Sequence, residues 1–426
     1  MNKSSKNIIL YVAQKPTSAM THIKAGLKKA LGYKVQVAVL FDKKNITKIE
    51  KPIIPSFDIL IPCDFRKPES IIEALSPYKD RLLAISTRAE KNIPYLQAAI
   101  PHVAYLRTPT IKSLEWSVDK IKMRKHFRAY DRKITPKFKI VKDTKKDSIK
   151  KIEDDIGYPV VIKPSGLAGS LLVTMAYHKE ELVKNLRTIF RKINKAHKDQ
   201  SGRGIPQVLV EQFMEGDMYS VDTYITSRGK IYFCPFVKVI TGKNIGFDDF
   251  FGYKRILPTK LSKENIKKAE TVATKSIHAL GLRSTTAHIE LMKTESGWKI
   301  IEVGPRIGGY RESMYREAYD IPHSVNDILI RIPAKPIIPK KIKAYTIVYN
   351  FYAKKEGWIA SMKGVKKAEN LASVKVFKQN KKIGDRSLFA KHGGKPVLEV
   401  TLVNKNRTEL LADSRRIEKL IDIKTK

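Results

Sequence analysis

Cysteine is scarce in this sequence, which has only Cys63 and Cys234 among 426 residues. The two cysteines do not have the spacing of metal ligands, so a disulfide framework and a zinc site are both disfavoured. The hydrophobic content of 42% is that of a folded protein. At this length we expect two to four domains rather than one core.

Long apolar runs are also missing. The first apolar segment, Ile8–Ala13, is too short for the hydrophobic region of a secretory signal, and Gln14 and Lys15 follow it at once. No stretch of eighteen or more apolar residues occurs anywhere. We therefore expect no membrane span and a cytoplasmic protein.

Acidic residues are few relative to basic ones: 42 Asp and Glu stand against 83 Lys and Arg, a net charge of +41. Such a field attracts nucleic acid, anionic membranes or small anions. The basic runs, such as residues 341–343 and 381–382, are short and scattered. We interpret the charge mainly as a solvated, lysine-rich surface, and a polyanion-binding face remains the alternative.

The usual glycine-rich nucleotide motifs are lacking as well. No Gly-x-Gly-x-x-Gly follows the first strand, which argues against a dinucleotide site, although apolar segments alternate with amphipathic ones over residues 1–110. That alternation predicts a parallel sheet. The predicted strands are 8–13, 34–41, 57–63 and 82–85, and the predicted helices are 20–31, 69–75 and 89–99.

Two acids in apolar surroundings are the most informative feature of the middle region. Glu290 lies within His-Ile-Glu-Leu-Met and Glu302 within Ile-Ile-Glu-Val-Gly, on two strands joined by a turn at Ser296-Gly297. A carboxylate in a core pattern is costly unless it is paired or binds a cation. Two such acids on neighbouring strands suit Mg²⁺, which prefers oxygen ligands. Edge-strand acids that pair with lysines are the plainer interpretation.

Two further segments carry polar groups that suit a nucleotide. Lys163 ends an apolar strand and leads into Pro-Ser-Gly-Leu-Ala-Gly-Ser, residues 164–170, whose small residues let backbone N–H groups approach phosphate. This is not a P-loop, because no Gly-Lys-Ser/Thr closes it. Residues 208–216, Val-Leu-Val-Glu-Gln-Phe-Met-Glu-Gly, are a strand that runs into a turn and could present its backbone to an adenine edge. Taken alone, each segment is more often a plain hairpin or strand end.

Together, in this order and spacing, these segments resemble the ATP-grasp superfamily over about residues 1–330. A predicted basic helix at 117–129, with Asp119-Lys120, matches the first lysine segment of that family, and Lys163 matches the second. The resemblance implies an ATP site and two Mg²⁺-binding acids, Glu290 and Glu302, with Arg306 as the catalytic phosphate- or carboxylate-binding arginine. The implied ATP-binding residues are Lys120, Lys163, Ser165, Gly166, Gly169, Ser170, Glu211, Gln212, Phe213, Met214, Asp217 and Met292.

The resemblance also implies the fold class: an α/β protein of α+β grasp type. We expect a parallel-sheet pre-grasp domain at 1–112, a two-lobed ATP-grasp domain at 113–332, and a small C-terminal α+β lobe at 340–426. Three prolines in residues 333–339 mark the last boundary. The sequence departs from the family at Gly304, where an asparagine that ligates metal is usual.

Among the branches of the superfamily, the pattern is most similar to the amino-acid ligases that make dipeptides, including the carnosine-synthase-like group. The implied activity is carboxylate–amine ligation through an acyl phosphate, with ATP, Mg²⁺ and small-molecule substrates, amino acids first among them. Specificity is expected in loops at 238–258 and 308–319. Two alternatives stay open: a basic nucleic-acid- or polyanion-binding protein on a grasp scaffold, and a ligase that acts on a large anionic partner.

Overall fold

The computed structural model describes residues 6–16, 23–48, 57–167, 169–199 and 206–426. Its N-terminal domain holds a four-stranded sheet of order β3-β2-β1-β4, and all three strand pairs are parallel, as the alternating pattern predicted. The start of the predicted helix at 20–31 lies outside the described residues. The elements are β1 Ile8–Ala13, α1 Ile23–Leu31, β2 Gln36–Asp42, β3 Ile59–Cys63, α2 Pro68–Leu75, β4 Leu82–Ser86 and α3 Ile93–Ala99.

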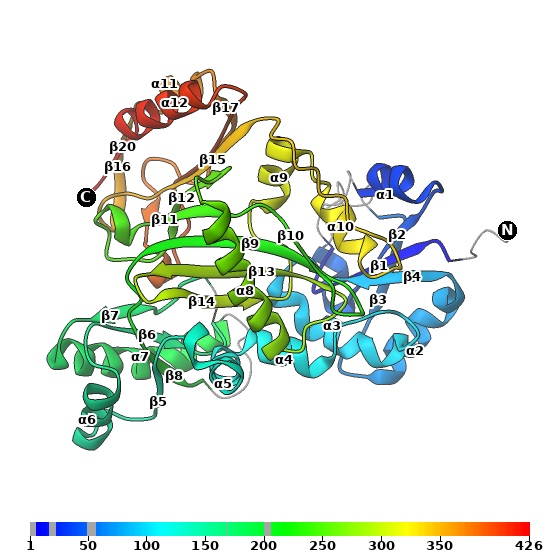
Figure 1. The fold of residues 1–426 in the computed structure, drawn as a ribbon, viewed down its shortest axis with the longest axis horizontal. Coiled ribbons are helices and arrows are strands. Elements are labelled where there is room, and N and C mark those ends of the chain that lie inside the picture. Colours follow the sequence, from blue (N-terminus) through cyan, green and yellow to red (C-terminus); the bar gives the residue numbers. More distant parts are fainter. Residues whose placement is uncertain (1–5, 17–22, 49–56, 168, 200–205) are drawn as a thin grey trace.

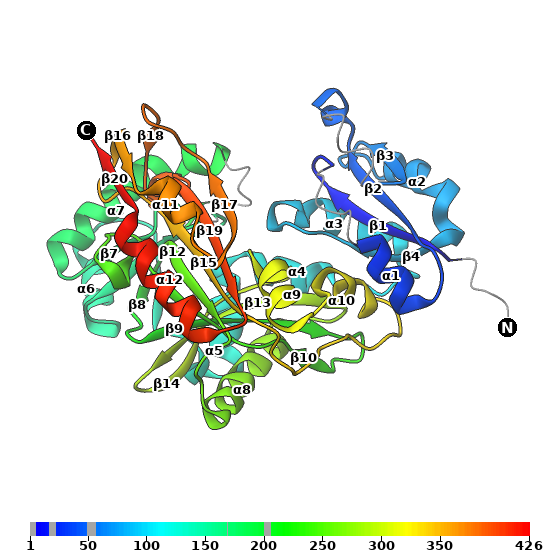
Figure 2. The ribbon, with the colours of Figure 1, turned by 90° about the horizontal axis from the view of Figure 1, so that it is seen from above.

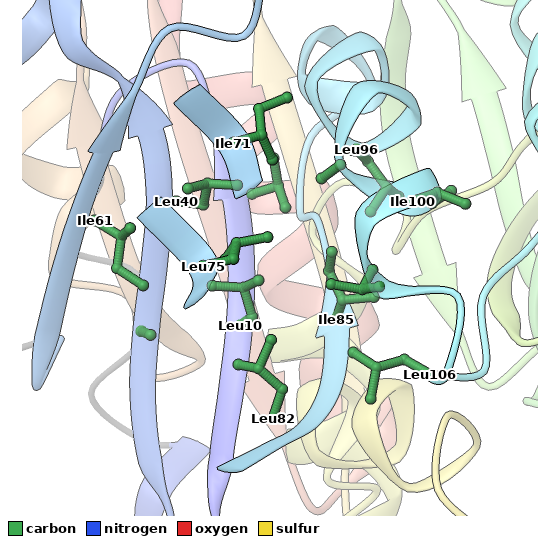
Figure 3. Close-up of a cluster of buried hydrophobic side chains, with 14 of the residues drawn as sticks. Leu10, Leu40, Ile61, Ile71, Leu75, Leu82, Ile85, Leu96, Ile100 and Leu106 are labelled. Carbon is green, nitrogen blue, oxygen red and sulfur yellow. The ribbon is translucent and has the colours of Figure 1, made fainter. Parts of the chain in front are cut away.

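One face of this sheet packs against α2 and α3. Leu10 and Leu40 lie fully buried between the strands and the helix residues Ile71 and Leu96, as Figure 3 shows. These apolar residues recur at helical spacing on the helices and at strand spacing on the sheet, so each element contributes one continuous face. The cluster is the core on which the N-terminal domain is built.

The other face of the same sheet is covered from a distant part of the sequence. Helix α10, His323–Leu329, places Val325, Ile328 and Leu329 in one buried cluster with residues of β1 and β2. Figure 1 shows α10 beside β1, β4 and α1. The first domain therefore takes part of its core from residues that the sequence assigned to the grasp domain.

A second, antiparallel sheet forms the small lobe that contains Lys163. Its order is β5-β8-β6-β7, with β5 Phe138–Val141, β6 Val160–Pro164, β7 Thr174–Ala176 and β8 Val208–Gln212. Helices α6, Lys146–Asp155, and α7, Lys179–Asp199, pack their apolar stripes against it. This lobe lies at the lower left of Figure 1.

The largest sheet joins the rest of the grasp domain to the C-terminal lobe. Its main path is β14-β13-β9-β11-β12-β15-β19-β17, and β10 pairs with β9. Because β15, β17 and β19 follow the proline-rich segment, no break in the sheet separates residues 340–426 from the domain before them. The strands are β9 Asp217–Ile225, β10 Ile231–Phe233, β11 Val237–Thr241, β12 Gly252–Leu257, β13 Thr285–Thr294, β14 Gly297–Gly304, β15 Tyr345–Phe351, β17 Val374–Gln379 and β19 Leu398–Asn404.

Helices cover both faces and one end of this sheet. Helix α8, Lys263–Ala279, packs on β13 and β14 through Ala269, Ala273 and Ile277. Helix α9, Arg311–Tyr319, lies near β15. At the end opposite the N-terminal domain, α11 Val365–Glu369, α12 Arg407–Leu420 and a small sheet of β16 Gly357–Lys363, β18 Arg386–Ser387 and β20 Asp422–Thr425 complete the C-terminal lobe (Figure 2).

Three of the sequence-based expectations about local structure were wrong. The predicted basic helix at 117–129 is two helices, α4 Ile111–Val118 and α5 Lys120–Tyr130, because Asp119 is extended and its side chain caps α5. The expected loop at 238–258 contains the end of β11 and all of β12. The expected loop at 308–319 is mostly helix α9. In both segments the many charged residues obscured the apolar period that would indicate a strand or a helix, and tertiary packing stabilises the regular structure.

No helix in the described part of the chain is both long enough and apolar enough to cross a bilayer.

Candidate functional site

A cavity of ≈ 530 Å³ lies between the small lobe and the large sheet, and residues from all parts of the chain line it. Most of the residues singled out from the sequence meet there, which short-range patterns alone could not show. Those that line the cavity are Lys120, Lys163, Gly169, Ser170, Glu211, Gln212, Phe213, Met214, Glu290, Met292, Glu302 and Arg306.

The two acids in apolar strands lie directly opposite each other on β13 and β14. On β13, Ile289 and Leu291 point into the core under α8, and strand alternation therefore turns Glu290 to the cavity. Both carboxylates are about one-third exposed. Burial raises the pKa of Glu290, but hydrogen bonding to His288 and the charges of Arg306 and Arg311 outweigh it and hold that pKa at about 2.

Lys163 is held by a carboxylate inside the protein. Its Nζ lies 2.6 Å from Glu211 Oε2, and Glu211 Oε1 accepts a bond of 2.5 Å from Arg124 Nε. Arg124 also donates to the carbonyls of Ile300 and Ile301 at 3.2 and 2.7 Å. The buried Arg124–Glu211 pair thus ties α5 and β8 to β14 and fixes Lys163 at the cavity wall.

Lys120 enters the cavity from the first residue of α5. Its Nζ donates to the Leu167 carbonyl at 2.9 Å and lies 3.4 Å from Glu302 Oε1. Burial opposes the ammonium charge, yet Glu302 and neighbouring acids raise the pKa of Lys120. The lysine is therefore charged and connects the glycine-rich loop to the acid pair.

The glycine-rich loop only partly matches its expected role. Gly169 and Ser170 line the cavity with positive φ of 69° and 60°. Ser165 does not line it: its N–H donates to the Gln207 carbonyl at 2.8 Å, and its Oγ accepts from Gln207 N–H at 3.2 Å. Gly166 is also outside the lining, so these two expected ATP contacts shape the base of the loop instead.

The strand end at β8 lines the cavity through Gln212, Phe213 and Met214, with Met292 from β13 nearby in the lining. Asp217, also expected as an ATP contact, is not among the residues that line the cavity. Asp217 lies on β9 next to the cavity-lining Met218, so alternation turns it away, and it pairs with Lys238 at 3.0 Å.

Arg306 follows the acidic strand and reaches a residue of the N-terminal domain. Its NH2 donates to Glu90 Oε2 at 2.9 Å. Burial lowers the pKa of the guanidinium, but Glu90 and Glu302 together raise it. The Cβ position of Gly304 is 3.5 Å from Arg306 and 3.6 Å from Glu90, and the backbone there is not left-handed, so the missing asparagine leaves room that these two residues border.

A buried aspartate organises the loop that carries Arg306. Asp222, on β9, accepts from His288 Nδ1 at 2.6 Å, from His323 Nε2 at 2.7 Å and from Gly308 N–H at 2.8 Å. Burial raises the pKa of Asp222, yet the two imidazoles outweigh it and lower that pKa well below its usual range. His288 Nε2 lies 3.5 Å from Glu290, so the network also orients one of the acids.

Sequence reasoning missed five of these cavity and network residues as functional candidates. Asp222 lies among apolar residues of a strand, the same signal that identified Glu290 and Glu302, whereas Arg124 is one of several cations in a basic helix and gave no such signal. Nothing in the local sequence pointed to Glu90, Arg255 or Arg311, which line the cavity from the N-terminal domain, from β12 and from α9.

The acid pair fits Mg²⁺ bound together with a nucleotide. Within the described residues, no group of three or more His, Cys, Asp or Glu side chains is arranged to hold a metal by itself. Mg²⁺ commonly takes only one or two carboxylates and completes its shell with substrate phosphates and water. Glu290 and Glu302, opposite each other and partly exposed, supply that donor set.

Comparison with known proteins agrees with this geometry. Residues 156–313 match the family described as the ATP-grasp domain. Alanine–anticapsin ligase of Bacillus amyloliquefaciens is 26% identical over 300 residues, which cover 66% of this chain and 61% of that protein. Of the first two curated relatives that it matches, the chain spans 45% and 61% of the length.

Solved structures share the fold over nearly the whole chain. L-amino acid ligase from Bacillus licheniformis is similar at a TM-score of 0.72 with 18% identity, covering 99% of both chains. N5-carboxyaminoimidazole synthetase from Staphylococcus aureus, solved with ADP, is similar at 0.65 with 13% identity, covering 96% of both. Residues 156–313 therefore match the ATP-grasp domain family, and they supply most of the cavity lining, including Lys163, Glu211, Glu290 and Glu302.

Proposed function

We propose that this chain is an ATP-dependent carboxylate–amine ligase that forms an amide through an acyl phosphate and releases ADP and phosphate. The observation that supports the proposal most directly is the meeting of two carboxylates and two lysines in one cavity. Glu290 and Glu302 face it from the large sheet, while Lys163 enters it from the small lobe and Lys120 from α5.

The lining suggests how ATP would lie. Lys120 and Lys163 are charged groups at the wall and suit the α- and β-phosphates. Phe213, Met214 and Met292 offer apolar surface for the adenine, next to the free end of β8. Gly169 and Ser170, at the tip of the loop, would cover the phosphates with backbone N–H groups.

Glu290 and Glu302 would hold Mg²⁺, which when bound neutralises the charge of phosphate oxygens during transfer. Arg306, close to both acids and held by Glu90, suits the transferred phosphoryl group because its planar guanidinium can bond two oxygens at once. The residues of the site position charge around the phosphates, and the mechanism requires no side chain to act as a nucleophile.

A substrate carboxylate oxygen attacks the γ-phosphorus, the bond to the β-phosphate oxygen breaks, and ADP leaves. The amine nitrogen then bonds to the acyl carbon, and the acyl C–O bond to phosphate breaks. Of the two protons that the ammonium form loses, one leaves on the inorganic phosphate and one goes to solvent. The ligase names of similar proteins support amino acids as the substrate class for this chain.

A direct test measures nucleotide products with pairs of amino acids in the presence of Mg²⁺. We expect ADP and phosphate in equal amounts and an amide product by mass spectrometry. AMP as the stoichiometric product, or no ADP with any pair, would contradict the proposal.

The alternative of a polyanion-binding protein rests on the net charge of +41 alone. Two carboxylates facing a cavity are unfavourable for a nucleic-acid surface. Binding to duplex DNA that weakens steeply with salt, without nucleotide turnover, would favour that alternative.

A further inference from the structure

Two guanidiniums in the cavity have no anionic partner. Arg255, on β12, and Arg311, at the start of α9, both line the cavity, and in the described part of the chain neither lies within 4.0 Å of a carboxylate. Arg311 is only 2% exposed, and its Nε is buried without a hydrogen-bond partner. The other buried arginines, Arg124 and Arg331, each pair with an acid.

The sheet register puts Arg255 on the same face as the metal acids. Glu290 pairs with Ser220, Ser220 with Val237, and Arg255 with Val239, so strand alternation puts Arg255 on the same face as Glu290, and both line the cavity. Three strand intervals separate β13 from β12, about 14 Å at the usual spacing. Arg255 therefore stands across the cavity floor from the acids.

Arg311 contacts β9, which lies between the acids on β13 and Arg255 on β12. Its guanidinium donates to Ser220 Oγ on β9 and to the Gly309 carbonyl at 3.1 Å, both neutral acceptors. The two arginines are close enough that the charge of Arg311 adds to burial in lowering the pKa of Arg255 to about 10. Two like charges with neutral partners therefore lie side by side in a partly buried place.

The position of the Arg255 guanidinium is fixed by contacts with neutral neighbours. It donates to the Gly252 carbonyl at 3.0 Å and lies over the Tyr310 ring, 4.9 Å from its centroid. A Cβ at Gly252 would come within 2.4 Å of Arg255, so a side chain there would displace the guanidinium. Asn350 and Tyr352, from the C-terminal lobe, complete the lining on this side.

Buried cations without an adjacent anion destabilise a fold, because removing charge from water costs several kcal/mol and neutral acceptors offset only part of it. Such a pair persists where a ligand supplies the missing anion. The phosphate end of the cavity already has its own cations in Lys120, Lys163 and Arg306. An anion at Arg255 and Arg311 would therefore be a group other than the ATP phosphates.

We propose that Arg255 and Arg311 form a subsite for the free carboxylate of the amine substrate, so that the acceptor is an amino acid rather than a simple amine. The inference rests on the proposed function. A carboxylate held at β12 and α9 would leave the amine of the same molecule facing the acyl phosphate formed near Arg306. These two arginines lie in the segments 238–258 and 308–319, where specificity was expected from the sequence.

The first test compares an amino-acid acceptor with its α-amide, for example alanine with alaninamide, at a fixed carboxylate donor. We expect the wild type to show a KM at least about 10-fold lower for the amino acid. Arg255→Met should raise the amino-acid KM to that of the amide and leave the amide KM unchanged. Equal use of both acceptors by the wild type, or equal effects of the variant on both, would overturn the subsite.

The second test separates a carboxylate from the phosphates of ATP. If the subsite serves the acceptor, Arg255→Met binds the nonhydrolysable analogue AMP-PNP with Mg²⁺ within about 2-fold of the wild type by calorimetry. A loss of 10-fold or more, with acceptor discrimination intact, would assign the guanidiniums to phosphate and overturn the proposal.

A third measurement needs no activity and decides the matter even if no ADP is released. Malonate, a small carboxylate probe, should raise the Tm of the wild type more than chloride does at equal ionic strength. It should not do so for Arg255→Met, and the Tm of that variant without ligand should rise by about 2 °C because an unpaired charge is gone. Arg415→Met, at an exposed position of α12, is the matched control and should behave as the wild type. No malonate effect, or a lower Tm in Arg255→Met, would overturn the subsite.

Discussion

At the end of the cavity formed by β6, β8 and α5, the cations Lys163, Lys120 and Arg124 each lie within 4.0 Å of a carboxylate. The two guanidiniums at the end formed by β12 and α9 have none within that distance in the described residues. Both ends are built from partly or fully buried charge. The first is complete within the protein and is therefore stable before any ligand arrives. The second is complete only when an anion binds, so its residues carry information about the substrate.

The difference has a physical basis in desolvation. A buried ion pair offsets much of its own cost, and breaking it by removing one partner is strongly destabilising. An unpaired buried cation has the opposite property, since removing it relieves the fold. Replacing a charged side chain by a neutral one should therefore destabilise the protein at the paired end of the cavity and stabilise it at the unpaired end.

The largest effect should come from the acids that separate the two ends. Glu302→Gln and Glu290→Gln should each lower the rate of ADP release about 10³-fold or more, because the neutral amide cannot hold Mg²⁺ on the phosphates. Steady-state rates at saturating Mg²⁺ measure this. Glu264→Gln, at an exposed pair with Lys268 on α8, is the control and should keep full activity. Near-normal rates in both cavity variants would remove the metal assignment.

Breaking the paired end should cost stability. Glu211→Gln leaves Arg124, 2% exposed, without its counter-charge, and we expect the free energy of unfolding to fall by about 3–5 kcal/mol. Urea unfolding followed by circular dichroism measures the loss. Glu264→Gln again serves as the control, with a change below about 1 kcal/mol. A fully stable Glu211→Gln protein would show that the Arg124–Glu211 pair does not stabilise the fold.

Lowering the pH should weaken the ion pairs that Glu211 forms with Arg124 and Lys163, and so lower the free energy of unfolding. Burial raises the pKa of Glu211, but Arg124 and Lys163 outweigh it and hold the folded-state pKa at about 2, against about 4.3 in an unfolded chain. Because the pKa of Glu211 is lower in the folded protein than in the unfolded chain, its negative charge stabilises the fold at pH values above the unfolded pKa. That stabilisation is lost as the pH falls toward the folded pKa. Between pH 5 and pH 3 this residue alone should account for a loss of about 2 kcal/mol.

Urea unfolding of the wild type and of Glu211→Gln at several pH values isolates that contribution, because other acids titrate alike in both proteins. The variant should show the shallower dependence on pH. Parallel curves would show that Glu211 does not titrate as its pairing implies.

The smallest effect concerns Gly304. Its backbone is not left-handed and the nearest atoms to a Cβ are 3.5 Å away, so Gly304→Asn should fold normally. The added amide oxygen next to the acid pair should lower the Mg²⁺ concentration needed for half-maximal ADP release about 2- to 5-fold. Titration of activity with Mg²⁺ measures the shift, and Gly304→Ala is the matched control. A lower Tm with unchanged Mg²⁺ dependence would contradict the expectation.

Much of the fold could be predicted because it rests on short-range patterns. Strand and helix periods in residues 1–110 indicated the parallel sheet, and apolar alternation around Glu290 indicated which of its neighbours would be buried. Helix ends were less well predicted: Asp119 looked like an ordinary residue within a basic helix, yet its cap divides that helix into α4 and α5. Local propensity does not fix such a boundary when tertiary packing favours another.

The sequence by itself determined the order of the segments that line the cavity and the identity of the acid pair, because each depends on a few adjacent residues whose chemistry is unusual in its local pattern. Only the tertiary structure decided which charges are partnered. Arg124 meets Glu211 from 87 residues away, Arg306 meets Glu90 from 216, and Arg311 meets Ser220 from 91. Pairing and desolvation are properties of the folded interior, so the contrast between the two ends of the cavity could not be read before the chain was folded.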